Sequence, residues 1–217
     1  MTVYNIIKVN ATKSTNDKVK MLIKSKKINN KDVISAKYQY KGKGQLARRW
    51  FSSYGNNLLC SLYLEFTKDF KSPIYALNFA TSLSVLKTVN FFSKEKGLIK
   101  WPNDILSENR KISGILIENN FKSSHLSYSI IGTGINVNQT RFNNLKHATS
   151  LKLISGKNID LDEVLDQLLK NYATYFKRIH DIKYLSKEFN QNLYGKNQCK
   201  FLIKEKIFNG KVERVLN

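Results

Sequence analysis

Two glycines and several basic residues lie in the segment KYQYKGKGQLARRWF, residues 37–51. Gly42 and Gly44 can adopt backbone conformations that other residues avoid, and they let a ligand approach the main chain. Successive N–H groups in such a turn form an anion-binding concavity. Positive charge nearby comes from Lys41, Lys43, Arg48 and Arg49. The segment predicts a loop that holds phosphate or carboxylate. A solvated basic turn is the alternative, because no Gly-Lys-Ser/Thr opens a helix here as in a Walker loop.

A second polar segment is KWPND, residues 100–104. Pro102 cannot continue a helix, so a strand, a turn and a second strand are predicted over residues 98–106. Asp104 is a candidate Mg²⁺ ligand, since Mg²⁺ commonly uses one or two carboxylates together with substrate phosphates. An Asx turn, in which Asn103 or Asp104 bonds its own backbone, explains the same residues without a function.

Polar residues also enter two apolar strands. Arg110 and Lys111 begin the strand-like segment RKISGILIE, and a lysine ammonium that points inward there needs an anionic partner. In GTGINVN, residues 132–138, glycines mark close approach of a ligand or another backbone. Asn136 and Asn138 alternate with apolar neighbours, so both are expected on one side of the sheet.

In this order the segments resemble the catalytic core of biotin protein ligases, enzymes that attach biotin to carboxylase carrier domains. The first matching motif is Ser14-Thr15-Asn16, and the resemblance as a whole covers roughly residues 1–195. KWPND followed by RK-x-x-GIL-x-E is highly specific in combination. It implies activation of biotin by ATP to biotinyl-5′-AMP and transfer to a lysine of the biotin carboxyl carrier protein of acetyl-CoA carboxylase. A lipoate ligase or octanoyltransferase of related fold, and a degenerate ligase that only binds biotin, are alternatives.

The resemblance implies a role for each matching residue. Residues that hold the biotin ureido group are Ser14, Thr15, Asn16 and Gln39. Residues that wrap the biotin carboxylate and the adenylate phosphate are Gly42, Lys43, Gly44 and Gln45. Trp50 and Gly114 line the biotin pocket, and the catalytic residues are Lys111 and Lys43. The nucleotide is assigned to Arg48, Asn103, Asp104 and Asn136, with Asp104 as the Mg²⁺ ligand.

The loop departs from the family pattern at three positions. The family often has Gly-Arg-Gly-Arg-x-Gly, whereas this chain has Lys43, Gln45 and Ala47 at the second, fourth and sixth places. Neither lysine nor glutamine reproduces the bidentate grip of arginine on a phosphate. The sequence therefore predicts a loop that holds the adenylate less tightly than an arginine-rich one. The chemistry requires no cysteine or Ser/His pair, and the isolated His125, His147 and His180 are expected at the surface.

Periodicity predicts an α+β fold with helices packed on a mixed or largely antiparallel sheet. Strands are predicted within residues 4–9, 32–39, 56–66, 98–106, 111–119, 127–138 and 198–216, and helices within 14–25, 72–92 and 160–179. Ser72 is expected to cap the second helix and Pro73 to begin it. The resemblance implies a class II synthetase-like biotin/lipoate ligase fold for residues 1–195. Residues 196–217 are predicted to be a short β segment, a truncated form of the family's SH3-like domain.

Composition places further bounds on function. The formal net charge of +21 raises affinity for polyanions. Lysine is dispersed along the chain, so a basic nucleic-acid-binding module ranks below the ligase. Cys60 and Cys199 lack metal-binding spacing and are expected as small buried residues.

The sequence also indicates where the protein is located and which partners it has. The chain has no apolar run that spans a bilayer and no recognisable signal peptide, so a cytoplasmic location without membrane contact is expected. It starts at the catalytic core rather than with the helix-turn-helix domain of some family members, so no specific DNA binding is expected. A homodimer through sheet edges is a candidate assembly in this family.

Overall fold

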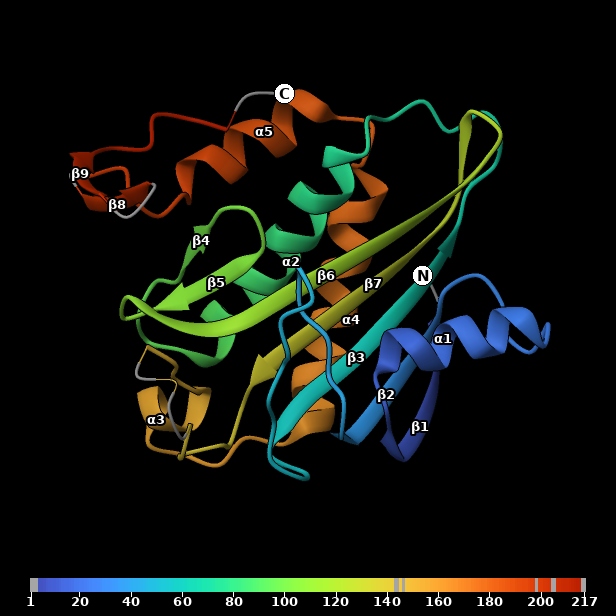
Figure 1. The fold of residues 1–217 in the computed structure, drawn as a ribbon, viewed down its shortest axis with the longest axis horizontal. Coiled ribbons are helices and arrows are strands. Elements are labelled where there is room, and N and C mark those ends of the chain that lie inside the picture. Colours follow the sequence, from blue (N-terminus) through green and yellow to red (C-terminus); the bar gives the residue numbers. More distant parts are fainter. Residues whose placement is uncertain (1–3, 143–144, 146, 198, 204–205, 216–217) are drawn as a thin grey trace.

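One mixed sheet organises the molecule (Figure 1). The computed structural model describes residues 4–142, 145, 147–197, 199–203 and 206–215. In these ranges seven strands form a sheet with the order β1-β2-β3-β7-β6-β5-β4. β1 and β2 are parallel, and every other neighbouring pair is antiparallel. The predicted α+β class and mixed sheet are confirmed.

The elements have the following bounds. The sheet strands are β1 (Asn5–Thr12), β2 (Asp32–Gln39), β3 (Asn57–Glu65), β4 (Leu98–Lys100), β5 (Asp104–Ser107), β6 (Arg110–Lys122) and β7 (His125–Asn136). The helices are α1 (Thr15–Lys24), α2 (Tyr75–Phe92), α3 (Leu151–Ser155), α4 (Leu161–Lys177) and α5 (Ile182–Gln191). A separate hairpin consists of β8 (Cys199–Ile203) and β9 (Lys206–Gly210).

Helices cover the two faces of the sheet unequally. α2 and α4 pack together on one face, where the larger core includes Leu83, Leu168 and Ile131. α1 covers part of the other face through Val19, which packs against Ile34 in a smaller cluster. Alternate strand residues point to opposite faces, so both faces of a central strand such as β3 are buried. The face beside α1 is left open, and the cavity described below lies there.

α2 begins two residues later than the sequence indicated. Its first helical residue is Tyr75 and its N-cap position is Ile74, so the prediction that Ser72 caps the helix is wrong. The Ser72 hydroxyl lies 2.6 Å from Nδ1 of His180 instead. A tertiary partner has thus replaced the local cap.

α5 places the following loop against the edge of the sheet. Phe189 stacks on Phe79 of α2, with ring centroids 4.3 Å apart. Beyond the helix, the backbone N–H of Ile99 donates to Asn192 O at 2.8 Å, and the N–H of Tyr194 donates to Ile99 O at 2.8 Å. These bonds hold Tyr194 beside β4.

The C-terminal segment returns to the main body. The N–H of Val212 donates to Gly195 O, and that of Val215 donates to Asn190 Oδ1, both at 2.7 Å. Both valines also pack on the larger core. The strand prediction for this segment is confirmed at β8 and β9, while residues 198, 204–205 and 216–217 lie outside the described residues. Its relation to an SH3-like domain stays a prediction.

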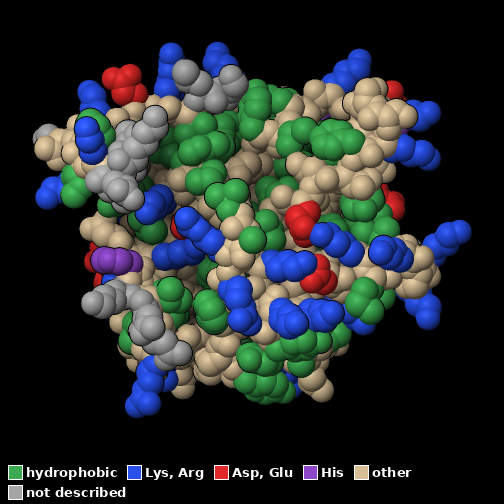
Figure 2. Space-filling model, in the orientation of Figure 1, with side chains coloured by type: hydrophobic (Ala, Val, Ile, Leu, Met, Phe, Trp, Pro, Cys, Tyr) green, Lys and Arg blue, Asp and Glu red, His purple; other side chains and the backbone are tan. Residues whose placement is uncertain are grey.

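Charge is distributed widely over the surface. In Figure 2, Lys and Arg side chains form a band across the middle of the viewed face and also stand out along its edges. This agrees with a basic surface more than with a single focused patch. Among the described residues, none of the helices is both long and apolar enough to cross a membrane.

Candidate active site

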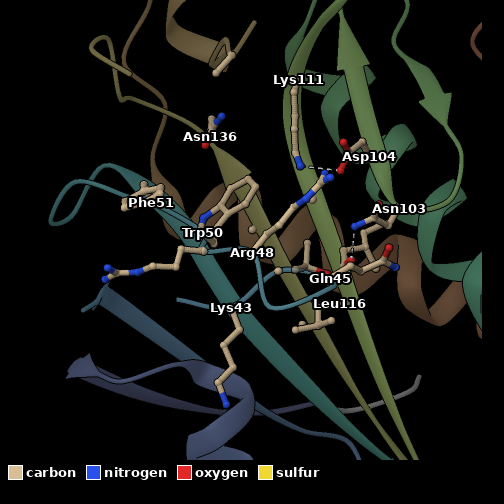
Figure 3. A pocket seen from close by; sticks show the side chains of 18 of the residues that line it. Lys43, Gln45, Arg48, Trp50, Phe51, Asn103, Asp104, Lys111, Leu116 and Asn136 are labelled. Carbon is tan, nitrogen blue, oxygen red and sulfur yellow. Dashed lines mark hydrogen bonds and ion pairs between the residues drawn. The ribbon is translucent and has the colours of Figure 1, made fainter. Parts of the chain in front are cut away.

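A cavity of about 1040 Å³ lies on the sheet face beside α1 (Figure 3). Its walls come from the N-terminus of α1, the segment after β2, the β4–β5 turn, and strands β6 and β7. Fourteen of the fifteen predicted site residues line it: Ser14, Thr15, Asn16, Gln39, Lys43, Gly44, Gln45, Arg48, Trp50, Asn103, Asp104, Lys111, Gly114 and Asn136. Gly42 is the exception. The structure thus brings residues from distant segments to one cavity.

Gly42 acts at the base of the loop rather than in the wall. A Cβ on Gly42 would lie 2.5 Å from the carbonyl oxygen of Trp50, a separation that real contacts do not show. The N–H of Trp50 donates to Gly42 O at 3.0 Å. Glycine is therefore required for the two ends of the loop to meet. This role in the loop backbone differs from the predicted contact between Gly42 and biotin.

One end of the cavity is polar and buried. Gln39 Oε1 accepts from the backbone N–H of Thr15 at 2.7 Å and lies 3.1 Å from its hydroxyl. Ser61 of β3 is fully buried, and its hydroxyl lies 2.7 Å from Thr15 Oγ1 and 2.6 Å from Asn16 Oδ1. Ser14 stands at the N-cap of α1, but its side chain makes no capping bond. This end offers fixed hydrogen-bonding groups to a small polar ring.

The centre of the cavity holds an ion pair beside an aromatic ring. Lys111 Nζ lies 2.6 Å from Asp104 Oδ1 and 5.5 Å from the centroid of the Trp50 ring. In Figure 3 the Arg48 side chain extends toward the same pair. The backbone of Lys111 is fixed by its N–H, which donates to His147 O at 2.7 Å. The inward ammonium of Lys111 therefore has the anionic partner that its position demands.

Trp50 lies against two glycines of neighbouring strands. Gly114 and Gly134 are paired in register across β6 and β7. Added Cβ atoms would lie 2.9 Å from Cζ3 and 2.7 Å from Cε2 of the Trp50 ring, respectively. The indole thus occupies the space that side chains would fill, and these strand glycines mark close approach of an aromatic side chain.

Replacing Gly134 with alanine is expected to displace Trp50. The new methyl group overlaps the ring, so we expect a loss of about 1–3 kcal/mol in the free energy of unfolding and weaker ligand binding. Chemical denaturation measures the first effect. A Trp50→Ala background supplies the control, because without the ring the alanine has nothing to displace. An equal loss of stability in both backgrounds contradicts the assignment.

The loop itself is held in an unusual backbone conformation. Leu46 and Ala47 both have positive φ, 52° and 60°, which costs non-glycine residues about 1–2 kcal/mol each. The N–H of Gly44 donates to Arg48 O at 2.7 Å and closes the turn. Lys43 points away from Lys111, because its ammonium pairs with Asp17 in the first turn of α1 at 2.6 Å. The two predicted catalytic lysines are therefore not side by side.

Two residues that were predicted to bind the nucleotide have side chains fixed by backbone partners. Asn103 Nδ2 donates to Ile115 O at 3.0 Å, and the N–H of Ile115 donates back to Asn103 O at 2.9 Å. Asn136 is buried and its Nδ2 donates to Thr149 O at 2.9 Å. These bonds engage the amide nitrogen of each side chain, so the orientation of both amides in the cavity wall is set by the backbone.

Comparison with known proteins identifies the family of this site. A sequence model of the Biotin/lipoate A/B protein ligase family matches residues 9–136, more than half of the chain. The chain belongs to the biotin/lipoate A/B protein ligase family. A biotin protein ligase from Aquifex aeolicus, solved with biotin and ATP, has a TM-score of 0.82 and 28% identity, with 99% of this chain and 89% of that chain covered.

Curated relatives of the biotin/lipoate A/B protein ligase family carry related names. The bifunctional ligase/repressor BirA of Bacillus spizizenii is 36% identical over 154 residues, which cover 66% of this chain and 46% of the relative. The biotin–[acetyl-CoA-carboxylase] ligase of Mycobacterium tuberculosis is 29% identical over 145 residues, which cover 64% of this chain and 51% of that protein. The chain thus spans about half the length of these relatives.

Some residues of this ligase-family cavity were missed by sequence reasoning. Ser61 does not line the cavity but bonds to Thr15 and Asn16 in its wall; it lies in an apolar run, where a lone serine was the only signal. His147 was expected at the surface without a role; it is exposed, yet it lines the cavity. Tyr194 also lines it and comes from a segment that no motif marked. Cys60 is buried as expected, and burial raises the pKa of its thiol to about 12, so it supplies no thiolate nucleophile.

The side chains of this ligase-family cavity suit a metal that arrives with a substrate. Among the residues that the structure describes, no group of three or more His, Cys, Asp or Glu side chains forms a metal cage. The cavity has Asp104 as one carboxylate in its wall, beside the amide of Asn103. Such a site fits Mg²⁺ that arrives on nucleotide phosphates, since that ion is held by one or two carboxylates plus phosphate oxygens.

Proposed function

We propose that this protein is an ATP-dependent biotin protein ligase that acts on the biotin carboxyl carrier protein of acetyl-CoA carboxylase. The single observation that carries the proposal is that Lys111, residues of the Gly42–Arg48 loop and the polar end at Thr15, Asn16 and Gln39 all line one cavity. The polar end suits a ureido ring, and we assign the Lys111 ammonium to the carboxylate and phosphate oxygens of the reacting substrates. Relatives and solved structures named as biotin ligases favour biotin over lipoate.

The proposed first step joins biotin to the nucleotide. A biotin carboxylate oxygen attacks the α-phosphorus of ATP, a new P–O bond forms, and pyrophosphate leaves. Negative charge develops on the phosphate oxygens, and its stabilisation is assigned to Lys111 and Arg48, which both line the cavity, and to loop N–H groups. Mg²⁺, when bound with ATP, supplies further neutralisation of phosphate charge, with Asp104 as the proposed protein ligand.

The proposed second step transfers biotin to the carrier. The amine of a carrier lysine attacks the acyl carbon of biotinyl-5′-AMP, an amide bond forms, and AMP leaves as the amine loses a proton. Neither step requires a protein nucleophile, which agrees with the buried thiol of Cys60. The cytoplasmic location and the homodimer stay predictions.

Mass spectrometry of a carrier domain tests the proposal. The protein is incubated with a biotin carrier domain, MgATP and either biotin or lipoic acid. We expect the carrier to gain one biotinyl group, only when both biotin and ATP are present. Transfer of lipoyl rather than biotinyl, or absence of both transfer and ATP–pyrophosphate exchange, overturns it. Salt-sensitive RNA binding without exchange would favour the nucleic-acid alternative.

A further inference from the structure

Glu118 is the last residue of the RKISGILIE segment and lies in β6 at the polar end of the cavity. Its carboxylate accepts from Asn16 Nδ2 at 2.8 Å and from Lys20 Nζ at 2.6 Å. The Glu118 side chain is 30% exposed and that of Lys20 is 41% exposed. Glu118 itself does not line the cavity, so any effect on a ligand passes through Asn16.

The partners of Asn16 determine which way its amide points. Nδ2 faces the Glu118 carboxylate and, at 3.4 Å, the backbone oxygen of Leu116. When the carboxylate is ionised, both of these groups can accept hydrogen bonds but cannot donate them. A flipped amide would place its oxygen against a carboxylate and leave its N–H groups facing the cavity. Glu118 therefore fixes the polarity of the Asn16 side chain.

The other end of the amide faces the cavity wall. Asn16 Oδ1 lies 2.6 Å from the Ser61 hydroxyl, and Ser61 is also 2.7 Å from Thr15 Oγ1. A Cβ on Gly132 would lie 2.4 Å from Asn16 Oδ1, so glycine makes room for this oxygen on the sheet. Asn16, Thr15 and Gly132 all line the cavity, and the Ser61 hydroxyl holds Asn16 Oδ1 and Thr15 Oγ1 in a fixed place at its polar end.

We infer that Glu118 is a positioning residue for substrate selection, which holds the Asn16 amide so that the cavity accepts hydrogen bonds from ligand N–H groups. This inference rests on the proposed function and names its specificity determinant. A cyclic urea has two ring N–H groups and gains from these acceptors. A dithiolane ring has no N–H group, so it gains nothing from these acceptors and binds less tightly to a polar site.

Replacing Glu118 with alanine tests the inference by calorimetric titration. We expect the Kd for biotin to rise about tenfold, the effect of one misplaced hydrogen bond, while the Kd for MgATP changes by less than about twofold. The KM for biotin should rise with little change in kcat. Glu65 supplies the matched control: it is a carboxylate on β3 bonded to Tyr63 Oη at 2.7 Å, and Glu65→Ala should leave biotin binding unchanged.

A polarity swap separates positioning from general destabilisation. Asn16→Asp places two carboxylates together and should weaken biotin binding. Adding Glu118→Gln gives the introduced carboxylate an N–H partner and leaves one of its oxygens toward the cavity, so biotin binding should recover by about tenfold relative to Asn16→Asp alone. Thermal midpoints are measured for each variant, and affinities are compared at a temperature where all are folded.

The outcomes distinguish this inference from the proposed function. If wild-type protein binds no biotin, the proposed function fails. If wild type binds biotin and Glu118→Ala binds it equally well, or if Glu118→Gln fails to restore binding to a folded Asn16→Asp variant, the positioning role is wrong and the proposed function stands.

Discussion

Replacing Lys111 with alanine is expected to lower the rate of biotinyl-5′-AMP formation by about 10²–10³-fold, the usual effect of removing one preorganised charge at a developing oxyanion. Lys111 Nζ lies 2.6 Å from Asp104 Oδ1, in the centre of the cavity and within reach of the Trp50 ring. When phosphate and carboxylate oxygens become more negative, this ammonium is already in place. ATP–pyrophosphate exchange with saturating biotin measures the rate.

The fold should survive the Lys111 change. The side chains of Lys111 and Asp104 are 37% and 22% exposed, and an ion pair that solvent reaches contributes about 1 kcal/mol or less. Lys87 gives a matched control, because it pairs with Glu188 at 3.0 Å outside the cavity. Lys87→Ala removes a similar pair and should keep full exchange activity. A folded Lys111→Ala variant with exchange within about threefold of wild type, far below the expected loss, contradicts the assignment.

The strands were predictable from local sequence because burial leaves a strong signal. β3 is buried up to its last residue and β2 is mostly buried, and their apolar runs end at residues that favour turns. α4 has acidic residues in its first turn and a basic one in its last, so its ends were also visible. The order of the strands in the sheet depends on pairings between distant segments, and the family resemblance supplied only its class.

Two helices were not predicted, for different physical reasons. α3 has five residues, too few for a periodic pattern, and depends on Ser150, whose hydroxyl accepts from the N–H of Leu153. α5 buries only Leu185 and Phe189, so most of its residues are polar or exposed. Its stability comes from packing on α2, which a local reading of the sequence does not contain.

The site also has a part that was predictable from the sequence and a part that was not. Motif residues such as Thr15, Gln39 and Lys111 were assigned from the resemblance, and the structure brings them to one cavity. The direction of each side chain was not predictable. Lys43 turns toward Asp17 because α1 places a carboxylate 2.6 Å from its ammonium, a contact between positions 26 residues apart. Ion pairs between separate elements require the fold before they can be recognised.

Gln45 is the second position where a large effect is expected. It lines the cavity on the loop whose next two residues have positive φ. In Figure 3 its side chain lies on the side of Asn103, below the Lys111–Asp104 pair. Gln45 offers a neutral amide where many family members have arginine, whose guanidinium holds a phosphate through two parallel bonds. The Lys43 ammonium is bound to Asp17, so it does not replace that charge at the cavity.

Replacing Gln45 with arginine is therefore expected to slow the release of biotinyl-5′-AMP by about tenfold to a hundredfold, as one charged hydrogen-bonding contact to phosphate contributes about 1.5–3 kcal/mol. The release rate is measured by preforming the adenylate with labelled biotin and diluting into excess unlabelled biotin and ATP. Gln191→Arg at the exposed end of α5 adds the same charge outside the cavity and should leave the rate unchanged. An unchanged or faster release from Gln45→Arg would mean that the loop holds the adenylate through its backbone N–H groups, and that the lost arginine has no bearing on its grip.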